Sequence, residues 1–166
     1  EEVQAGAPHY PGTYLVGGYN RLESEVQGRV VENEDLVNWP NWLSLSFRCE
    51  DGDWLDFRNL QLFEYTQNLN LLRGVLSRRM RFRDRLKREF SLESRRLVHM
   101  GDANLAAIEW VLTPLNWSGR IEIRSAIDGR VENRGVERYR DLASDHLEPV
   151  ASGSSGESAV YLVTRT

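Results

Sequence analysis

The chain has 166 residues, of which 40% are hydrophobic and 28% are charged, and its formal net charge is −4. This length predicts one domain that buries about 70% of the surface of its unfolded chain. The weakly acidic balance gives no indication of nucleic-acid or membrane binding, and no apolar run is long enough to cross a bilayer. The single cysteine, Cys49, excludes an internal disulfide and fits a reducing compartment, so we expect a cytoplasmic location.

The first predicted elements are a single helical turn over EDLVNW (34–39) and a strand over WLSLSFRC (42–49). The strand alternates apolar and polar residues, which is typical of a half-buried strand. Its core side comprises Leu43, Leu45, Phe47 and Cys49. The thiol of Cys49 is therefore expected to be buried and inert.

A loop of three residues, Asp51 to Asp53, is predicted to return the chain as an antiparallel hairpin. The register that keeps apolar residues on one side puts Phe47 opposite Phe57 and Arg48 opposite Asp56. These aromatic and charged pairs are each worth roughly 0.2–1 kcal/mol. In this register Trp42 and Trp54 lie on the side away from the aliphatic core.

Further strands are predicted in the middle of the chain from the same alternation. Leu76, Met80 and Phe82 share one face, and so do Ile108, Trp110 and Leu112. Between them, the run 90–100 is assigned with Phe90 on one side and with Leu92, Val98 and Met100 on the other. The intervening stretch DANLAA (102–107) is predicted to form one helical turn.

The last third of the chain is predicted to contain two strands and two turns. Ile121, Ile123 and Ile127 alternate along one strand, and Asp128-Gly129 is a hairpin-turn signal. GSSG (153–156) is expected to be a flexible surface loop, and AVYLVTRT (159–166) reads as a strand with two apolar faces. The sequence begins EEVQAG and ends within this strand, so we expect a domain cut from a longer chain.

The sequence offers no motif for catalysis, for a metal or for a cofactor, so no catalytic, metal or cofactor-binding residue is predicted. His9, His99 and His146 lie far apart and are expected to be structural. The predicted loop accounts for Asp51 and Asp53, and the predicted pair with Arg48 accounts for Asp56, so no catalytic role is assigned to this cluster. Asn116-Trp117-Ser118 matches a glycosylation acceptor, but nothing else in the sequence indicates secretion.

The run RRMRFRDRLKR (78–88) contains seven basic residues and one acid. One interpretation is nucleic-acid binding, with cations on phosphates and Phe82 stacked on a base. The other is a solvated hairpin whose basic residues flank Met80 and Phe82 and discourage aggregation. We favour the second, because the rest of the chain is net acidic and no aromatic platform accompanies the run.

Several stretches together resemble the N-terminal domain of glycoside hydrolase family 65, which is known mainly for maltose, trehalose and kojibiose phosphorylases. They occur in the family's order and span nearly the whole chain. These stretches are GTYLVGGYNRL (12–22), LVNWPNWLSLSFR (36–48), RGVLSRRMRFRD (73–84), SRRLVHMGDANLAAIEWVLTPLNWSG (94–119) and IRSAIDGRVENRGVERYRDL (123–142).

The resemblance implies an all-β fold, a large antiparallel β-sandwich of the super-sandwich type, as one N-terminal domain over residues 1–166. It implies that the catalytic (α/α)6 barrel, with its general-acid glutamate and phosphate site, lies in the absent downstream part. The chain is then a non-catalytic structural and assembly domain. The parent enzyme would cleave an α-linked glucose disaccharide, with inorganic phosphate as co-substrate or with water. The expected partners are the barrel, a further copy in a homo-oligomer and, at most peripherally, the disaccharide, with neither nucleic acid nor membrane.

The three clustered tryptophans Trp39, Trp42 and Trp54 are the candidate functional side chains. We favour their burial in a second layer or in an interface with the barrel, because an open face with two tryptophans would be an unusual apolar patch. The alternative is an independent carbohydrate-binding module, in which exposed tryptophan rings stack on sugars.

Overall fold

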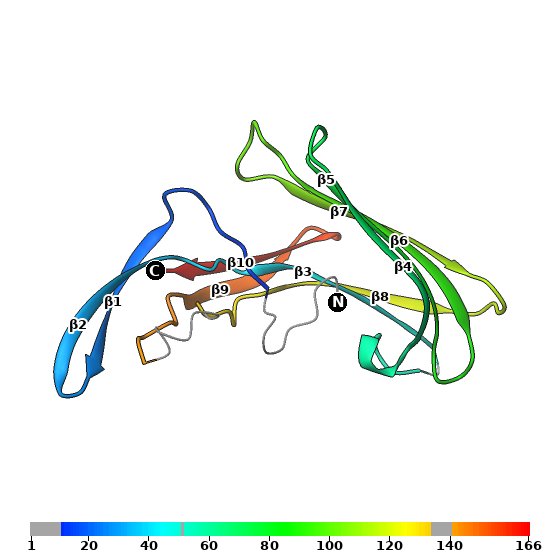
Figure 1. The fold of residues 1–166 in the computed structure, drawn as a ribbon, viewed down its shortest axis with the longest axis horizontal. Helices are drawn as coiled ribbons and strands as arrows, with labels where there is room; N and C mark the ends of the chain where they lie inside the picture. Colours follow the sequence, from blue (N-terminus) through cyan, green and yellow to red (C-terminus); the bar gives the residue numbers. More distant parts are fainter. Residues whose placement is uncertain (1–10, 51, 134–140) are drawn as a thin grey trace. The chain divides into compact units, whose positions relative to one another are not determined.

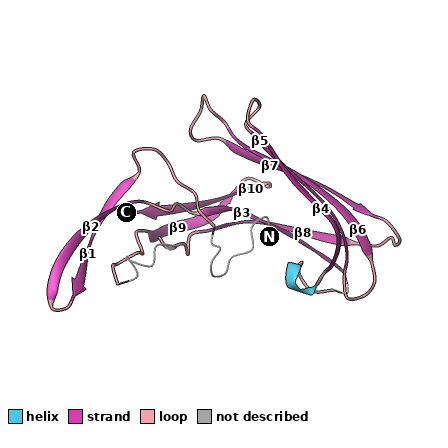
Figure 2. Ribbon diagram, viewed as in Figure 1, coloured by secondary structure: helices cyan, strands magenta, loops and turns pink. Residues whose placement is uncertain are grey.

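The computed structural model describes residues 11–50, 52–133 and 141–166. This part of the chain contains ten strands and one short 3-10 helix, η1 (Phe57–Asn59) (Figures 1 and 2). The strands are β1 (Tyr19–Val26), β2 (Arg29–Leu36), β3 (Asn41–Cys49), β4 (Gln61–Asn70), β5 (Val75–Arg83), β6 (Glu89–Val98), β7 (Ala106–Pro114), β8 (Ile121–Asp128), β9 (Glu148–Ser155) and β10 (Ala159–Arg165). Their described registers are antiparallel, which confirms the predicted all-β class.

The chain divides into two compact units, one from residues 1–46 and 123–166 and the other from residues 47–122. The first contains the hairpins β1–β2 and β9–β10, and the second contains the four-stranded sheet β4-β5-β6-β7. The prediction that residues 1–166 form one domain stays a prediction.

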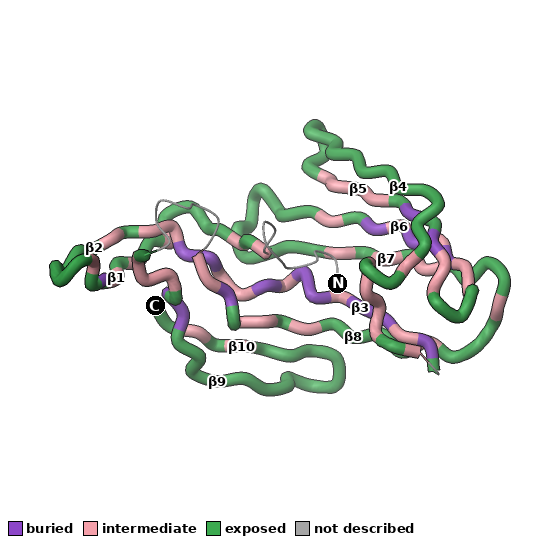
Figure 3. Tube along the Cα trace, turned by 60° about the horizontal axis from the view of Figure 1, so that its bottom comes forward, coloured by how far each residue is buried: buried purple, intermediate pink, exposed green. Residues whose placement is uncertain are grey.

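The core of unit 47–122 lies on one face of the four-stranded sheet and is built from alternate residues of β5 and β6. Phe82 and Phe90 stack with ring centroids 5.3 Å apart, and Phe47 lies 5.4 Å from Phe90. The buried cluster comprises Phe47, Cys49, Met80, Phe82, Phe90 and Leu92, and Figure 3 shows buried stretches along these strands. The predicted face of Met80 and Phe82 and the burial of Cys49 are therefore confirmed.

Two predictions within this unit are wrong. Phe90 and Leu92 are two residues apart in β6, so they share the core face and do not lie on opposite sides. Residues 102–107 form no helical turn. Instead, Asp102 accepts a hydrogen bond from Asn104 N at 2.9 Å, which makes a tight turn before β7 begins at Ala106.

The predicted hairpin after β3 is also wrong, because residues 54–56 form no strand. Leu55 N donates to Phe47 O at 2.9 Å, so Leu55 lies beside Phe47, at the place predicted for Phe57. Asp56 caps η1 by accepting from Arg58 N at 3.0 Å. The chosen apolar residues were nevertheless the right ones, since Leu55 and Phe57 both pack against the predicted core.

Strand β3 pairs with β8, which the sequence did not predict. It is buried on both faces, because Ser44 and Ser46 are as inaccessible as Leu43 and Phe47. Serine side chains are small enough for close packing on the second face. The hairpin expected at Asp128-Gly129 is absent from the described chain, where Asp128 instead accepts hydrogen bonds from Arg130.

Two asparagines organise the unit formed by residues 1–46 and 123–166. The buried side chain of Asn38 donates to Pro11 O at 3.0 Å and accepts from Thr13 N at 2.9 Å. Asn133 accepts from Asn38 N at 2.8 Å and donates to Leu36 O at 2.8 Å. These bonds fix the chain immediately after β2. Residues 34–36 form the end of β2 and residues 37–39 are irregular, so the predicted helical turn over 34–39 is wrong.

The β9–β10 hairpin includes most of the segment predicted to be a loop. Gly153 lies in β9 directly opposite Tyr161, and a β-carbon on Gly153 would lie 2.9 Å from the tyrosine hydroxyl. The ring therefore covers the glycine, which compensates for its poor strand propensity. Gly156, with φ of 66°, makes the turn, and the predicted final strand is confirmed as β10.

Candidate functional site

A cavity of about 250 Å³ opens in unit 47–122 beside Trp54. Its apolar lining belongs to the core and includes Phe47, Leu55, Phe82 and Phe90. Its polar lining comprises Arg48, Asp53, Asp56, Asn59, Asp84, Arg85 and Arg88. An apolar floor with a few polar groups at the rim is the usual composition of a small-ligand site.

Three segments bring these side chains together. Strand β3 supplies Phe47 and Arg48, and the irregular chain that follows it, with the end of η1, supplies residues 52–56, Asn59 and Leu60. The turn between β5 and β6 supplies residues 84–86 and Arg88. This turn is tight because Asp84 N donates to Arg88 O at 3.0 Å and Asp84 accepts from Arg88 N at 2.9 Å.

Arg48 connects the tryptophan at the rim to a carboxylate. Its guanidinium lies 4.9 Å from the centroid of the Trp54 ring, within cation–π distance, and its Nε donates to Glu122 Oε2 at 2.6 Å. The hydrogen bond from Arg48 is the main cause that lowers the pKa of Glu122. Arg48 was predicted to pair with Asp56, and the structure shows that it pairs with Glu122 instead.

Two carboxylates that line the cavity, Asp56 and Asp84, are also paired with arginines. The hydrogen bond from the Arg58 side chain, followed by that from its backbone, lowers the pKa of Asp56. Asp84 accepts from Arg88 Nε at 2.7 Å in a pair that is largely shielded from solvent. A general acid in glycoside cleavage needs a raised pKa, whereas the pKa of Asp56 and that of Glu122 are both lowered.

The three candidate tryptophans are not gathered at this cavity. Only Trp54 lines it. Trp39 and Trp42 belong to the other unit, where Trp39 packs against Val37, Val131 and Leu147. All three tryptophans are half-buried, so none presents the fully open ring of the sugar-platform interpretation. Their burial in an interface with a partner stays a prediction.

The polar rim was missed by sequence reasoning, although its residues lie in stretches that drew attention for other reasons. Asp84, Arg85 and Arg88 belong to the basic run 78–88, and Asn59 follows the predicted hairpin. Arg85 donates a hydrogen bond to the Asn59 side chain and so connects the two segments. No local pattern predicts this contact, because it depends on the pairing of β4 with β5.

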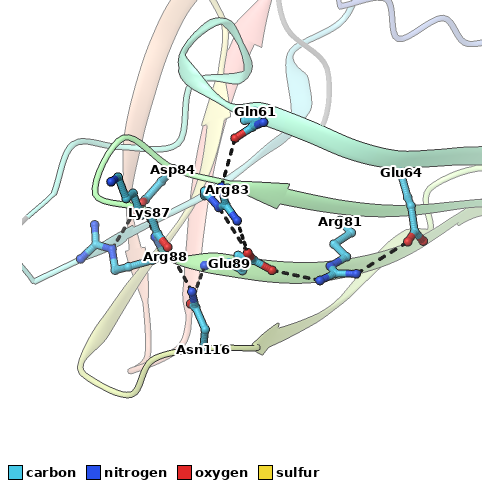
Figure 4. Close-up of polar contacts among 9 residues, drawn as sticks. All are labelled: Gln61, Glu64, Arg81, Arg83, Asp84, Lys87, Arg88, Glu89 and Asn116. Atoms are coloured by element: carbon cyan, nitrogen blue, oxygen red, sulfur yellow. Dashed lines mark hydrogen bonds and ion pairs between the residues drawn. The ribbon is translucent and has the colours of Figure 1, made fainter.

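Arg81 and Arg83 of the basic run form an ion-pair network centred on Glu89, shown in Figure 4. Glu89 accepts from Arg83 at 2.5 Å and from Arg81 at 3.0 Å, and these two bonds lower its pKa. Arg79 pairs with Glu93 at 3.2 Å. These cations are neutralised within the β5–β6 hairpin, which supports the interpretation of a solvated hairpin over that of a nucleic-acid surface.

Asn116 closes one end of this network (Figure 4). Its side-chain oxygen accepts from Glu89 N at 2.8 Å, and its amide donates to Lys87 O at 3.1 Å. Both ends of the amide are therefore used to hold the β5–β6 turn against the chain that follows β7. This contact gives the Asn116-Trp117-Ser118 sequence a structural explanation.

The described histidines have separate environments, and His9 lies outside the described residues. His99 Nδ1 accepts from Gly101 N and Asp102 N at 3.2 and 2.8 Å, and buried His146 lies 3.3 Å from Asp35. Among residues 11–50, 52–133 and 141–166, no three side chains of the metal-ligating types are grouped together. Across the same residues there is no helix with the length and apolar character needed to span a membrane.

Comparison with known proteins identifies related sequences. The sequence model of the glycosyl hydrolase family 65 N-terminal domain matches residues 1–166. An uncharacterized glycosyl hydrolase of Mycobacterium tuberculosis is 45% identical over 84% of this chain and 10% of its own length. A kojibiose phosphorylase of Caldanaerobacter subterraneus is 32% identical over 94% of this chain and 19% of its own length. A trehalose 6-phosphate phosphorylase of Lactococcus lactis is 30% identical over 84% of this chain and 18% of its own length.

The chain thus spans between a tenth and a fifth of the length of these relatives. The match to the family covers all five stretches that carried the resemblance, and the antiparallel sheets support the β-sandwich class that it implied. The chain belongs to the family of glycosyl hydrolase family 65 N-terminal domains.

Proposed function

We propose that residues 1–166 are a non-catalytic structural and assembly domain of a longer family 65 enzyme. The parent enzyme cleaves an α-linked glucose disaccharide in the cytoplasm, with inorganic phosphate or water as the attacking group. In this proposal the domain packs against the catalytic barrel and contributes no residue to the reacting atoms.

The main support is the size of the match. The whole chain matches an N-terminal domain, yet it spans only 19% of a kojibiose phosphorylase and 18% of a trehalose 6-phosphate phosphorylase. Those relatives are named as disaccharide or disaccharide-phosphate phosphorylases, which supports an α-glucoside as the substrate class. The relative named as a glycosyl hydrolase supports water as the alternative attacking group.

The electrostatics of the cavity give a second line of support. Inverting cleavage needs a protonated carboxyl on one side of the glycosidic bond and space for the attacking group on the other. Asp56 and Glu122 are instead held by Arg58 and Arg48, and each pairing lowers the pKa of the carboxyl. Such groups are suited to holding the fold together and unsuited to donating a proton.

The proposal is tested by separating the two parts of the full-length enzyme. Removal of residues 1–166 should lower the melting temperature of the remaining barrel, because an apolar interface would become exposed to water. The enzyme's activity should reside in the part beyond residue 166. A remaining part with unchanged thermal stability would contradict an assembly role.

A second candidate, a carbohydrate-binding module, is favoured by one observation: the Trp54 rim lies beside Asp53, Asn59 and Arg85. Polar groups around an aromatic ring are suited to sugar hydroxyls. Tryptophan emission of chain 1–166 should then change saturably with kojibiose or maltose, and Trp54→Phe should abolish the change. Trp42→Phe is the matched control, because Trp42 is also half-buried in a β-rich setting but does not line the cavity.

A further inference from the structure

Two hairpin turns lie next to each other at one end of the four-stranded sheet. The β4–β5 turn follows Asn70, and the β6–β7 turn follows Val98. Strands β5 and β6 pair in a register that places Val75 opposite Leu97, so both turns belong to the same end of the sheet (Figure 1). We call residues 69–74 and 97–105 the paired tips.

The paired tips are apolar where hairpin turns are ordinarily polar. The exposed fractions are 83% for Leu71, 96% for Leu72 and 94% for Met100. Further large apolar side chains with more than half of their surface exposed are Leu69, Val98 and Leu105. Large apolar side chains exposed to this degree at neighbouring turns are typical of a contact with another protein surface.

Polar residues fold these turns, while the apolar side chains are left on the outside. In the first turn the Asn70 side chain accepts from Arg73 N at 3.0 Å, and Gly74 adopts a φ of 62°. In the second, His99 accepts from the backbone N–H groups of Gly101 and Asp102. Both tips therefore have defined backbone shapes, which reduces the entropy lost when the tips bind a surface.

Charge is a second property of this end of the sheet. Arg79, Arg83 and Arg95 each have a carboxylate within 3.4 Å. Arg73, in the first tip, and Arg96, directly before the second tip, have no such carboxylate partner among the described residues. The carboxylate of Asp102 is already used to accept from Asn104 N. A complementary surface therefore offers apolar side chains together with carboxylates.

We propose that the paired tips dock on the catalytic part of the parent enzyme, on a surface that carries apolar side chains and carboxylates. This rests on the proposed function and adds the surface by which the two parts meet. The occupant follows from length: the relatives extend over at least five times the residues that this chain covers, since it spans 10–19% of them. A surface of the same polypeptide is present at high effective concentration and would cover the tips continuously.

Photo-crosslinking of the full-length enzyme tests the proposal. Leu72 and Met100 are replaced one at a time by p-benzoylphenylalanine, and Leu86 is replaced as the matched control. Leu86 is 56% exposed and lies in the β5–β6 turn, at the opposite end of the same sheet. We expect positions 72 and 100, but not position 86, to crosslink to residues beyond 166 of the same chain.

Charge reversal provides an independent readout. The double variant Arg73→Glu and Arg96→Glu should reduce the crosslinking yield from position 100 by at least about twofold, as expected for loss of rim charge pairs. Arg29→Glu is the control, because Arg29 is an exposed residue of the β1–β2 hairpin without an ion-pair partner among the described residues. An equal loss of yield in the control would contradict the assigned charge complementarity.

The outcomes separate this inference from the proposed function. Crosslinks that join two copies, or probes at 72 and 100 that yield no crosslink, would overturn docking of the tips on the catalytic part. If the barrel nevertheless loses thermal stability when residues 1–166 are removed, the assembly role stands and only the assigned surface is wrong. If removal changes nothing, the proposed function itself fails.

Discussion

Arg48 Nε donates to Glu122 Oε2 at 2.6 Å and thereby joins β3 to β8. This contact replaces the cross-strand partner that alternation suggested, because Asp56 turns away to cap η1 and pairs with Arg58. The cavity beside Trp54 exists because residues 52–60 leave the sheet at this point and do not form a second strand of the predicted hairpin.

The first prediction follows from this pair. Arg48→Gln should raise the pKa of Glu122 toward its ordinary value, because the hydrogen bond from Arg48 is the first cause of its lowering. The pKa of Asp56 should stay low, since Arg58 holds it. Carbon-13 NMR titration of the side-chain carboxyls measures both. A rise in the pKa of Asp56 with no change in the pKa of Glu122 would contradict the Arg48–Glu122 pair and support the Arg48–Asp56 pair predicted from the sequence.

The second prediction concerns the aromatic core of unit 47–122. Phe90 is buried and contacts Phe47, Phe82 and Trp117 with centroid distances of 5.2 to 5.4 Å. Phe90→Ala should lower the free energy of unfolding by about 3–5 kcal/mol, the usual cost for a buried phenylalanine. Phe63→Ala is the control, because Phe63 is exposed, and it should cost less than about 1 kcal/mol. Urea denaturation compares them, and equal losses would contradict the assigned core.

The third prediction concerns acid stability. The hydrogen bonds from Arg83 and Arg81 lower the folded-state pKa of Glu89 below its ordinary value of 4.5. A lowered pKa stabilises the fold above the unfolded-state value, and this contribution is lost as the pH falls through the folded-state value. The melting temperature should therefore fall as the pH drops below 4.5, and Glu89→Gln should flatten this decline.

Glu25→Gln serves as the control for this experiment, because Glu25 is exposed in β1 and has no ion-pair partner among the described residues. It should reproduce the wild-type dependence on pH. An unchanged acid decline in Glu89→Gln would show that the Glu89 network does not contribute to acid stability.

The fourth prediction concerns Asn116. Asn116→Ala removes two hydrogen bonds, one from Glu89 N and one to Lys87 O, each worth about 1 kcal/mol. The amide of Glu89 should exchange with solvent roughly tenfold faster or more, in line with such a loss. Hydrogen exchange measured by NMR tests this, with the core amide of Leu92 as internal reference. Equal acceleration at both amides would indicate general destabilisation and not a local role.

Much of the fold could be predicted from alternation. The core faces of β5 and β7 and the final strand follow from period two, and Leu55 and Phe57 were correctly assigned to the core of Phe47. Period two reports which side of a strand is apolar, but it does not report which strand pairs with it. The pairing of β3 with β8 joins residues roughly 70–90 positions apart, so no local pattern contains it.

The candidate site was less predictable, for a related reason. Trp54 was noticed because tryptophan is rare, and it does line the cavity. Asn59 and Arg85 became neighbours only through the β4–β5 pairing, and Trp39 and Trp42 were placed in the other unit. Residues 102–107 were predicted as a helical turn but form a tight turn and the start of β7. Residues 153–156 were predicted as a loop but mostly belong to β9, because a glycine-containing strand resembles a loop when its partner strand is not known.

The central claim is that residues 1–166 lack the catalytic machinery of their parent enzyme. The most direct measurement is the release of glucose and glucose phosphate from kojibiose, trehalose and maltose, with and without inorganic phosphate. The account predicts release by the full-length enzyme and none by purified chain 1–166. Release from the isolated chain, in proportion to its concentration and retained through further purification, would contradict it.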